Sequence, residues 1–266
     1  MNVIELSVLD LSLAAFLLLG HAALDLSLRL GLGRTLLLSA LRAAVQLTLL
    51  GLILGWIFEQ RDPAAVVGLS LLMATIAGIE AVQRTTRRVP GLRVLGVGVM
   101  LTSSLAITAY GVGAVVGPEP WWDPRYAIPV LGMVLGNSLT GISLGLETSL
   151  EGYDRERSWV EWRLALGATV REAARPIQRR ALRAGLLPIL NSMAAAGLIS
   201  IPGMMTGQIL GGESPDAASR YQIFILFLIA GAVALGTLAA VLGCTRLVFD
   251  QRGRLRVDRI TRKVLD

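Results

Sequence analysis

Apolar residues form long blocks along this chain, and most polar residues lie in the segments between the blocks. About 20 apolar residues are needed for a helix to cross a bilayer, and lipid offers no partner to a non-helical backbone. The pattern therefore predicts an all-α, polytopic transmembrane helix bundle of about seven spanning helices. We expect one transmembrane domain over residues 1–266, with predicted spans at residues 4–28, 35–58, 63–83, 92–117, 126–150, 185–211 and 221–248.

The basic residues are divided unequally between the two sides of the predicted bundle. Of the 25 basic residues, 21 lie in alternate segments between or after the blocks, and only Arg61, Arg125 and Arg220 lie in the other segments. Short loops rich in Arg and Lys stay in the cytoplasm. The sequence thus predicts the N-terminus outside and the C-terminus in the cytoplasm.

Composition agrees with a membrane protein and excludes other classes. Hydrophobic residues make up 54% and charged residues 17% of the chain, whereas about 25% of a soluble domain is charged. The net charge of +6 comes without interleaved aromatic residues, so we expect no nucleic-acid partner. Cys244 and His21 are the sole residues of their kinds, which excludes an internal disulfide and a Cys/His zinc site.

One predicted cytoplasmic loop, residues 151–184, is long and charged but has an apolar thread. It could lie on the membrane surface, or it could dock a soluble partner. The chain contains no GxxxxGK[ST] phosphate-binding loop, so active transport would need an ion gradient or a partner ATPase. The residues that we predict to couple to an ATPase are Glu161, Trp162, Leu166, Gly167, Ala168 and Ile177.

The spacing within this loop resembles the "EAA" loop of ABC importers. Glu161 precedes Gly167 by six residues and Ile177 follows Gly167 by ten, but Arg179 and Arg180 stand where a Leu-Pro pair should close the motif. A glycine between two short helices lets them meet at an angle.

Several longer strings resemble the FetB-type permease family. They are LRAAVQLTLLG (41–51), GMVLGNSLTGISLGLE (132–147), ERSWVEWRLALGAT (156–169), ISIPGMMTGQILGG (199–212) and YQIFILFLI (221–229). The resemblance implies a non-enzymatic subunit of the bacterial cytoplasmic (inner) membrane that dimerises, binds two ABC ATPase subunits and exports iron or a related metal species. Plant relatives act in aluminium tolerance. ATP and Mg would be bound by the partner, with no cofactor in this chain.

Polar residues inside the predicted spans are candidates for the substrate path, since a charge there costs about 2.5–3.5 kcal/mol. Arg42 and Gln46 share one helix face, and Arg42 could pin two helices together through Glu80 or Glu147, or contact substrate. Asn137 lies in a glycine-rich span, where we expect it to bond across a helix contact.

A break is predicted in the sixth span at Pro202 and Gly203, because proline cannot donate to the helix ladder. Non-helical backbone at membrane depth lies within protein or beside a cavity. Met204, Met205 and Gln208 follow the break. They either fill the core or line a substrate path.

A metal site is harder to assign. Iron prefers hard oxygen ligands, whereas thioethers suit Cu(I). Few carboxylates lie within the spans, so we expect the exported species to be a chelate. His21 and Asp25 are predicted to form a structural pair. The weak candidates for metal ligands are Asp10, Glu80, Glu147, Met204 and Met205.

Two other functions remain open from the sequence. A gradient-driven carrier usually has inverted repeats with paired broken helices, and only one break is evident here. A membrane scaffold would need no ATPase. The basic tail, residues 250–266, is predicted to be a solvated, lipid-facing segment, with an ATPase contact as the alternative.

Overall fold

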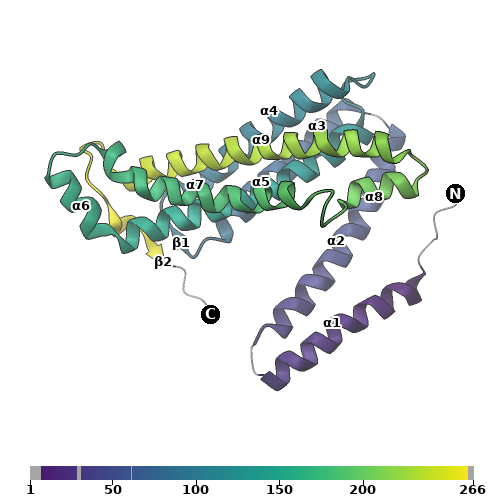
Figure 1. Ribbon diagram of the computed structural model, residues 1–266, viewed down its shortest axis with the longest axis horizontal. Helices are drawn as coiled ribbons and strands as arrows, with labels where there is room; N and C mark the ends of the chain where they lie inside the picture. Colours follow the sequence, from purple (N-terminus) through teal and green to yellow (C-terminus); the bar gives the residue numbers. More distant parts are fainter. Residues whose placement is uncertain (1–6, 29–30, 61, 263–266) are drawn as a thin grey trace.

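The computed structural model describes residues 7–28, 31–60 and 62–262 and is nearly all helical (Figure 1). The prediction of a helical chain is therefore confirmed. A π-helix, Tyr110–Val116, extends α4, and two short strands, β1 (Arg87–Arg88) and β2 (Thr261–Arg262), pair antiparallel. The α-helices are α1 (Val8–Leu28), α2 (Gly33–Gln60), α3 (Pro63–Gln83), α4 (Leu92–Ala109), α5 (Pro124–Arg155), α6 (Arg157–Ala165), α7 (Val170–Ala195), α8 (Gly203–Leu210) and α9 (Pro215–Val248).

Within the described residues, six segments are long and apolar enough to cross a membrane. They are α1, α2, α3, α4 with its π-helical extension, α5 and α9. The predicted sixth span, residues 185–211, is not one helix. Its first part belongs to α7, residues 196–202 are not helical, and α8 begins at Gly203.

The break before α8 lies at the predicted proline, but it is longer than the predicted break at Pro202 and Gly203. Pro202 is the residue before α8, and its carbonyl accepts the first helical bond, from the amide of Thr206. Gly197 adopts a positive φ of 80°, which ends α7 in a turn that a residue with a side chain would resist. The interruption is therefore a seven-residue link rather than a kink.

Close approach of helices forms the centre of the bundle, where α5 contacts both α7 and α9. A Cβ atom built on Gly185 of α7 would lie 2.5 Å from the carbonyl oxygen of Gly141 of α5 and 2.6 Å from Cγ2 of Thr237 of α9. In a bilayer, small residues at such contacts allow the backbone packing that holds helices together. The glycine-rich face of α5 therefore packs within this chain at Gly141.

The α1–α2 hairpin leans away from the other helices (Figure 1). Asp25 closes its turn by accepting hydrogen bonds from the amides of Leu32 (2.9 Å) and Gly33 (2.8 Å). The expected His21–Asp25 pair is thus wrong, because both carboxylate oxygens satisfy the free amides at the start of α2. His21 is exposed.

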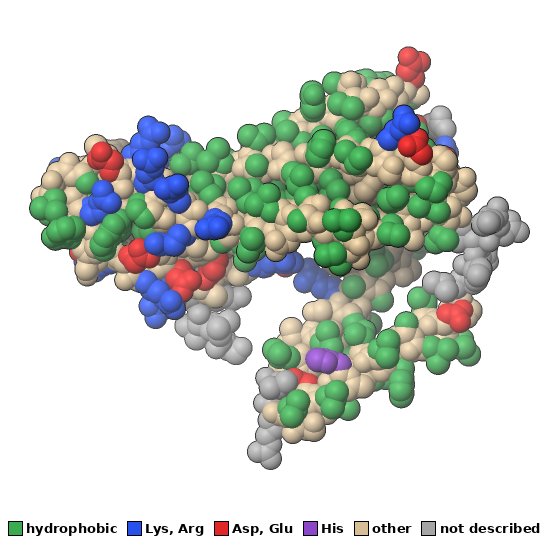
Figure 2. All heavy atoms as spheres, viewed as in Figure 1, with side chains coloured by type: hydrophobic (Ala, Val, Ile, Leu, Met, Phe, Trp, Pro, Cys, Tyr) green, Lys and Arg blue, Asp and Glu red, His purple; other side chains and the backbone are tan. Residues whose placement is uncertain are grey.

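The two ends of the bundle differ in chemistry. Figure 2 shows most Arg and Lys side chains of the visible face gathered around α6, whereas the middle is largely hydrophobic. We call these ends the α6 end and the α8 end (Figure 1). Three residues used in the charge argument, Arg29, Arg61 and Lys263, lie outside the described residues.

Candidate functional site

The predicted docking loop is a helical hairpin at the α6 end. It consists of α6, a turn at residues 166–169 and the first turns of α7. Gly167 adopts a φ of 89° in the turn, a conformation that glycine reaches without strain. Thr169 then caps α7, with a reciprocal capping box to Glu172. The amide and the hydroxyl of Thr169 donate to the Glu172 carboxylate and lower its pKa.

Large apolar side chains face outward from this hairpin. Trp162 is 61% exposed, Leu166 is 67% exposed, and Trp159 is partly exposed beneath the guanidinium of Arg163, whose Cζ lies 5.1 Å from the ring centroid. A hollow of about 540 Å³ lies between these residues and the turn. We define Trp159, Trp162 and Leu166 as the docking surface. A cluster of exposed apolar groups with a charged rim is typical of an interaction site.

Not every predicted coupling residue belongs to this surface. Glu161 is exposed and accepts a hydrogen bond of 2.8 Å from Nε of Arg157 in the preceding turn. Ala168 lines the hollow beside Gly167. Ile177 is instead fully buried against Gly152 of α5. Its predicted place in the docking loop is therefore wrong, because the inward face of α7 places it in the core.

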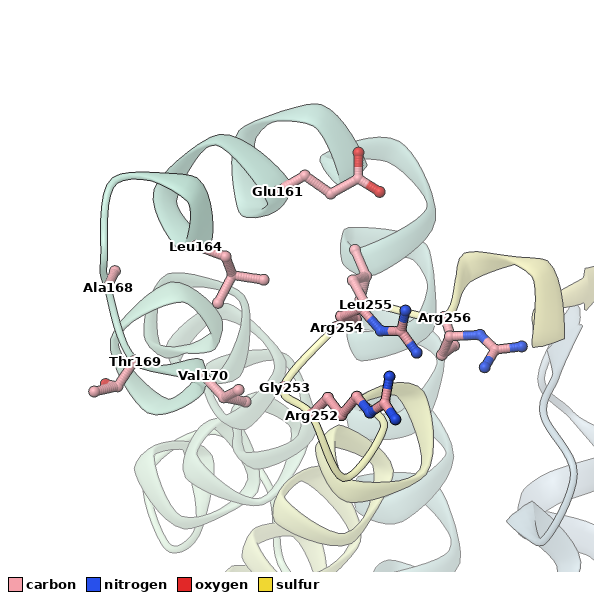
Figure 3. A pocket seen from close by; sticks show the side chains of 10 residues that line it. All are labelled: Glu161, Leu164, Ala168, Thr169, Val170, Arg252, Gly253, Arg254, Leu255 and Arg256. Carbon is pink, nitrogen blue, oxygen red and sulfur yellow. The ribbon is translucent and has the colours of Figure 1, made fainter.

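A cleft of about 700 Å³ lies on the other side of α6 (Figure 3). The hairpin contributes Glu161, Leu164 and Val170 to one wall, and the C-terminal tail contributes Arg252, Arg254 and Arg256 to the other. Arg254 is held by Asp250 and Arg256 by Asp258. Backbone and side-chain donation from Arg254 lowers the pKa of Asp250, because these hydrogen bonds favour the ionised carboxylate.

The tail itself is not the lipid-facing segment that we predicted. Phe249 packs edge-to-face on Tyr153, and Leu255 is buried in the core. Beyond Leu255, β2 pairs with β1 in the link between α3 and α4. Val257 and Ile260, the next described apolar residues of the alternating pattern, pack against the same core, and the tail forms a fixed wall of the cleft.

A partly buried ion-pair network around Arg87 fastens the tail. Nε of Arg87 lies 2.9 Å from Oδ2 of Asp154, and its Nη1 lies 3.4 Å from Oε1 of Glu147. Arg262 of the tail also reaches Asp154, at 3.0 Å. Sequence reasoning missed this network, although two acids seven residues apart lie on one face of a helix and could have suggested it.

The candidates for a substrate path separate into different regions. Arg42 and Gln46 are exposed on α2. Glu80 pairs with Arg84 and Glu147 with Arg87, so neither is the predicted partner of Arg42. Nδ2 of Asn137 donates to the Met133 carbonyl of its own helix at 2.9 Å. The expected bond across a helix contact is therefore wrong, since the Asn137 amide bonds back to its own helix.

The α8 end holds the other candidates. Pro202 and Gly203 start α8, and Met205 is partly buried. Met204 and Gln208 line a pocket of about 390 Å³ between the first turns of α5 and α9. Met204 and Gln208, in the helix that follows the break, thus lie beside a cavity, and their role in a substrate path stays a prediction.

Comparison with known proteins assigns the chain to a family. Residues 8–249 match the family described as "Uncharacterised protein family (UPF0014)". The chain belongs to this family. A UPF0014 membrane protein of Synechocystis, slr1647, is 37% identical over 81% of this chain and 83% of its own length.

Two further UPF0014 relatives carry more descriptive names. The protein ALUMINUM SENSITIVE 3 of Arabidopsis thaliana is 33% identical over 88% of this chain and 84% of its own. The probable iron export permease protein FetB of Escherichia coli is 29% identical over 96% of both chains. No solved structure matches. The resemblance inferred from the sequence is confirmed, and family and helices together make the chain a multi-pass membrane protein.

The weak candidates for metal ligands lie in different parts of the structure. Asp10 accepts from the amide and hydroxyl of Ser7 at the start of α1, Glu147 is part of the Arg87 network, and Met204 and Met205 lie in α8. Among the described residues, no three His, Cys, Asp or Glu side chains gather as a metal site would require. These residues therefore do not form one site for a bare ion.

Proposed function

We propose that this chain is the permease subunit of an ABC transporter that exports iron or a related metal species, with ATP hydrolysed by a separate ATPase. The observation that carries the proposal is the exposed docking surface of Trp159, Trp162 and Leu166 at the arginine-rich end. Aromatic side chains that protrude from a short helix suit a groove on a partner protein. The names of FetB and of the Arabidopsis relative support a metal as cargo.

In this proposal the chain crosses the membrane about seven times, with α7 and α8 together as the additional crossing. The arginine-rich α6 end then lies in the cytoplasm and the N-terminus outside, in the inner membrane of a bacterium. Two copies of the single domain would bind two ATPase subunits. ATP and Mg would be held by the ATPase, and this chain would catalyse no reaction.

α7 provides a physical route from the ATPase to the far side of the bundle. Its 26 residues would extend about 39 Å at 1.5 Å per residue. The helix starts at the docking turn, Ile177 fixes it to Gly152 of α5, and it ends at the link to α8. Closure of the ATPase dimer would push the docking surface, and α7 would transmit the movement as a lever between inward-open and outward-open states.

The test is reconstitution with the ATPase encoded beside this chain, if such a gene exists. Trp162→Ala and Gly167→Val should abolish co-purification and ATPase stimulation, because they remove an exposed anchor and distort the turn. Trp121→Ala is the matched control, because Trp121 is also exposed but lies at the α8 end. Transport that continues without any ATPase, driven by an ion gradient, would refute the proposal and favour the carrier alternative.

A further inference from the structure

The pocket at the α8 end joins α5 to the consecutive helices α8 and α9, which lie far from it in the sequence. Arg125 and Tyr126 come from the first turn of α5, Met204 and Gln208 from α8, and Tyr221 from α9. Glu213, in the link between α8 and α9, completes the polar lining. Its volume of about 390 Å³ lies within the range of small-molecule sites.

The two charged side chains of this pocket, Arg125 and Glu213, take part in no ion pair among the described residues. Oε1 of Gln208 is shielded from solvent and lacks a hydrogen-bond partner. A shielded acceptor without a partner costs free energy unless a ligand or water satisfies it. The neighbouring Arg220, by contrast, is already paired with Asp216 at 2.7 Å.

We propose that this pocket binds a small, oxygen-rich anion that carries carboxylate and hydroxyl groups, either free or as the chelate of a metal. Arg125 would bind a carboxylate through its planar guanidinium. Gln208 Oε1, once its side chain turns toward the pocket, would accept a hydrogen bond from a ligand hydroxyl group. Glu213 would meet a hydroxyl group or a metal-bound water on the opposite side, since a carboxylate repels a ligand's own carboxylates.

A bare metal ion fits the lining less well. The lining contains one carboxylate, and the cationic Arg125 lies in the same pocket, where it would repel a cation. Hard ions such as ferric iron prefer several oxygen ligands, which a chelator brings with it. The inference rests on the proposed function in one respect, which is that the ligand is the transported species. Binding of the ligand in the pocket requires no ATPase.

The experiment is calorimetric titration of the full chain, purified without an ATPase, with ferric citrate, citrate alone or ferrous sulfate as probes. We expect ferric citrate or citrate to bind, and Arg125→Gln to weaken binding at least about tenfold, the loss expected for one charge-assisted hydrogen bond. Arg220→Gln, the matched control outside the pocket, should bind as the unaltered chain does. Glu213→Gln should reduce the preference for the chelate over free citrate if Glu213 meets a metal-bound water, and should change both affinities alike if it meets a ligand hydroxyl group.

Two results would overturn the inference. One is binding of ferrous ion that Arg125→Gln leaves unchanged, together with no binding of either citrate probe. The other is citrate binding that both Arg125→Gln and Gln208→Leu leave unchanged, which would place the anion elsewhere. If Arg125→Gln does not fold, Gln208→Leu alone decides the location. Failure of the ATPase reconstitution with intact citrate binding would refute the proposed coupling and leave this pocket standing.

Discussion

Single residues decide how closely the helices of this bundle approach. At Gly185, Gly141 and Thr237 the backbones of α5 and α7 and a side chain of α9 meet with no room for a methyl group. Glycine at such a position costs conformational entropy on folding but permits the contact. The same residue type at Gly136, one helical turn away on α5, has open space around it.

Gly185→Ala should therefore destabilise the protein by about 1–3 kcal/mol, the usual cost of overpacking. The added Cβ would meet the Gly141 carbonyl oxygen, which belongs to a helix backbone and cannot move aside cheaply. The thermal midpoint of unfolding in detergent measures the effect. Gly136→Ala is the matched control and should leave the midpoint unchanged or slightly raised; equal losses in both variants would contradict the packing argument.

Glu172 contributes to stability only while it is ionised. The amide and hydroxyl of Thr169 depress its pKa below the ordinary value of 4.5 in the folded state. A group with a depressed folded pKa stabilises above its unfolded pKa, and this contribution is lost as the pH falls through the folded value. Glu172→Gln should lower the unfolding midpoint at neutral pH, and the difference should vanish at an acidic pH below the folded pKa of Glu172. Glu119→Gln, in the exposed link after α4, is the control and should show no difference at either pH.

At the scale of elements, the C-terminal tail behaves as part of the bundle. Its anchor is a charge network in which Arg87 is largely buried, with a side-chain exposure of 10%. Removal of one partner from a buried pair leaves charges without compensation, at a cost of about 3–5 kcal/mol. Since Glu147 and Asp154 keep some exposure, the lower end of that range applies.

Arg87→Gln should release the tail and make its arginines faster targets for trypsin. The unfolding midpoint should fall as well, in line with a loss of about 3 kcal/mol. Arg84→Gln is the matched control, because Arg84 pairs with Glu80 one turn away at 3.6 Å and is 53% exposed; such pairs contribute about 0.5 kcal/mol or less. Tail cleavage at an unchanged rate in Arg87→Gln would show that other contacts hold β2.

The sequence anticipated these elements unevenly. The break at Pro202 was predictable because it follows from the missing amide of proline. The turn at Gly167 was also predictable, because a glycine at this spacing favours a turn, and its φ of 89° is one that glycine adopts without strain. The buried tail was not predictable, since alternation of basic and apolar residues fits a lipid surface equally well. The place of Ile177 was missed for a similar reason: linear spacing does not tell which face of α7 meets α5.

At the scale of the whole molecule, the two ends of the bundle have separate tasks in the proposed function. The α6 end carries the docking surface and most of the arginines on the visible face (Figure 2). The α8 end carries the pocket around Arg125 and Gln208. α7 connects the two ends, so a movement at the docking surface can change the pocket without a soluble domain in this chain.

Labelling from each side of the membrane tests this orientation. The only native thiol, Cys244, is buried, so the unaltered chain should react little with a charged maleimide. Ser158→Cys, on exposed α6, should react only when the reagent reaches the cytoplasmic side. Glu119→Cys, at the other end, is the counterpart and should react from outside in intact cells. Reaction of the Ser158→Cys variant from outside would invert the orientation and remove the basis for ATPase docking.

The sequence by itself determined the helical membrane class, the asymmetry of charge and the family, because each depends on composition and order along the chain. Only the tertiary structure decided which side chains of the chain contact one another. It paired Glu80 with Arg84 and Glu147 with Arg87 rather than with Arg42, turned Ile177 and Leu255 inward, and brought Arg125, Gln208 and Glu213 to one pocket. Most of these contacts join residues far apart in the chain, and the geometry of helix packing, which no local pattern encodes, sets which of them meet.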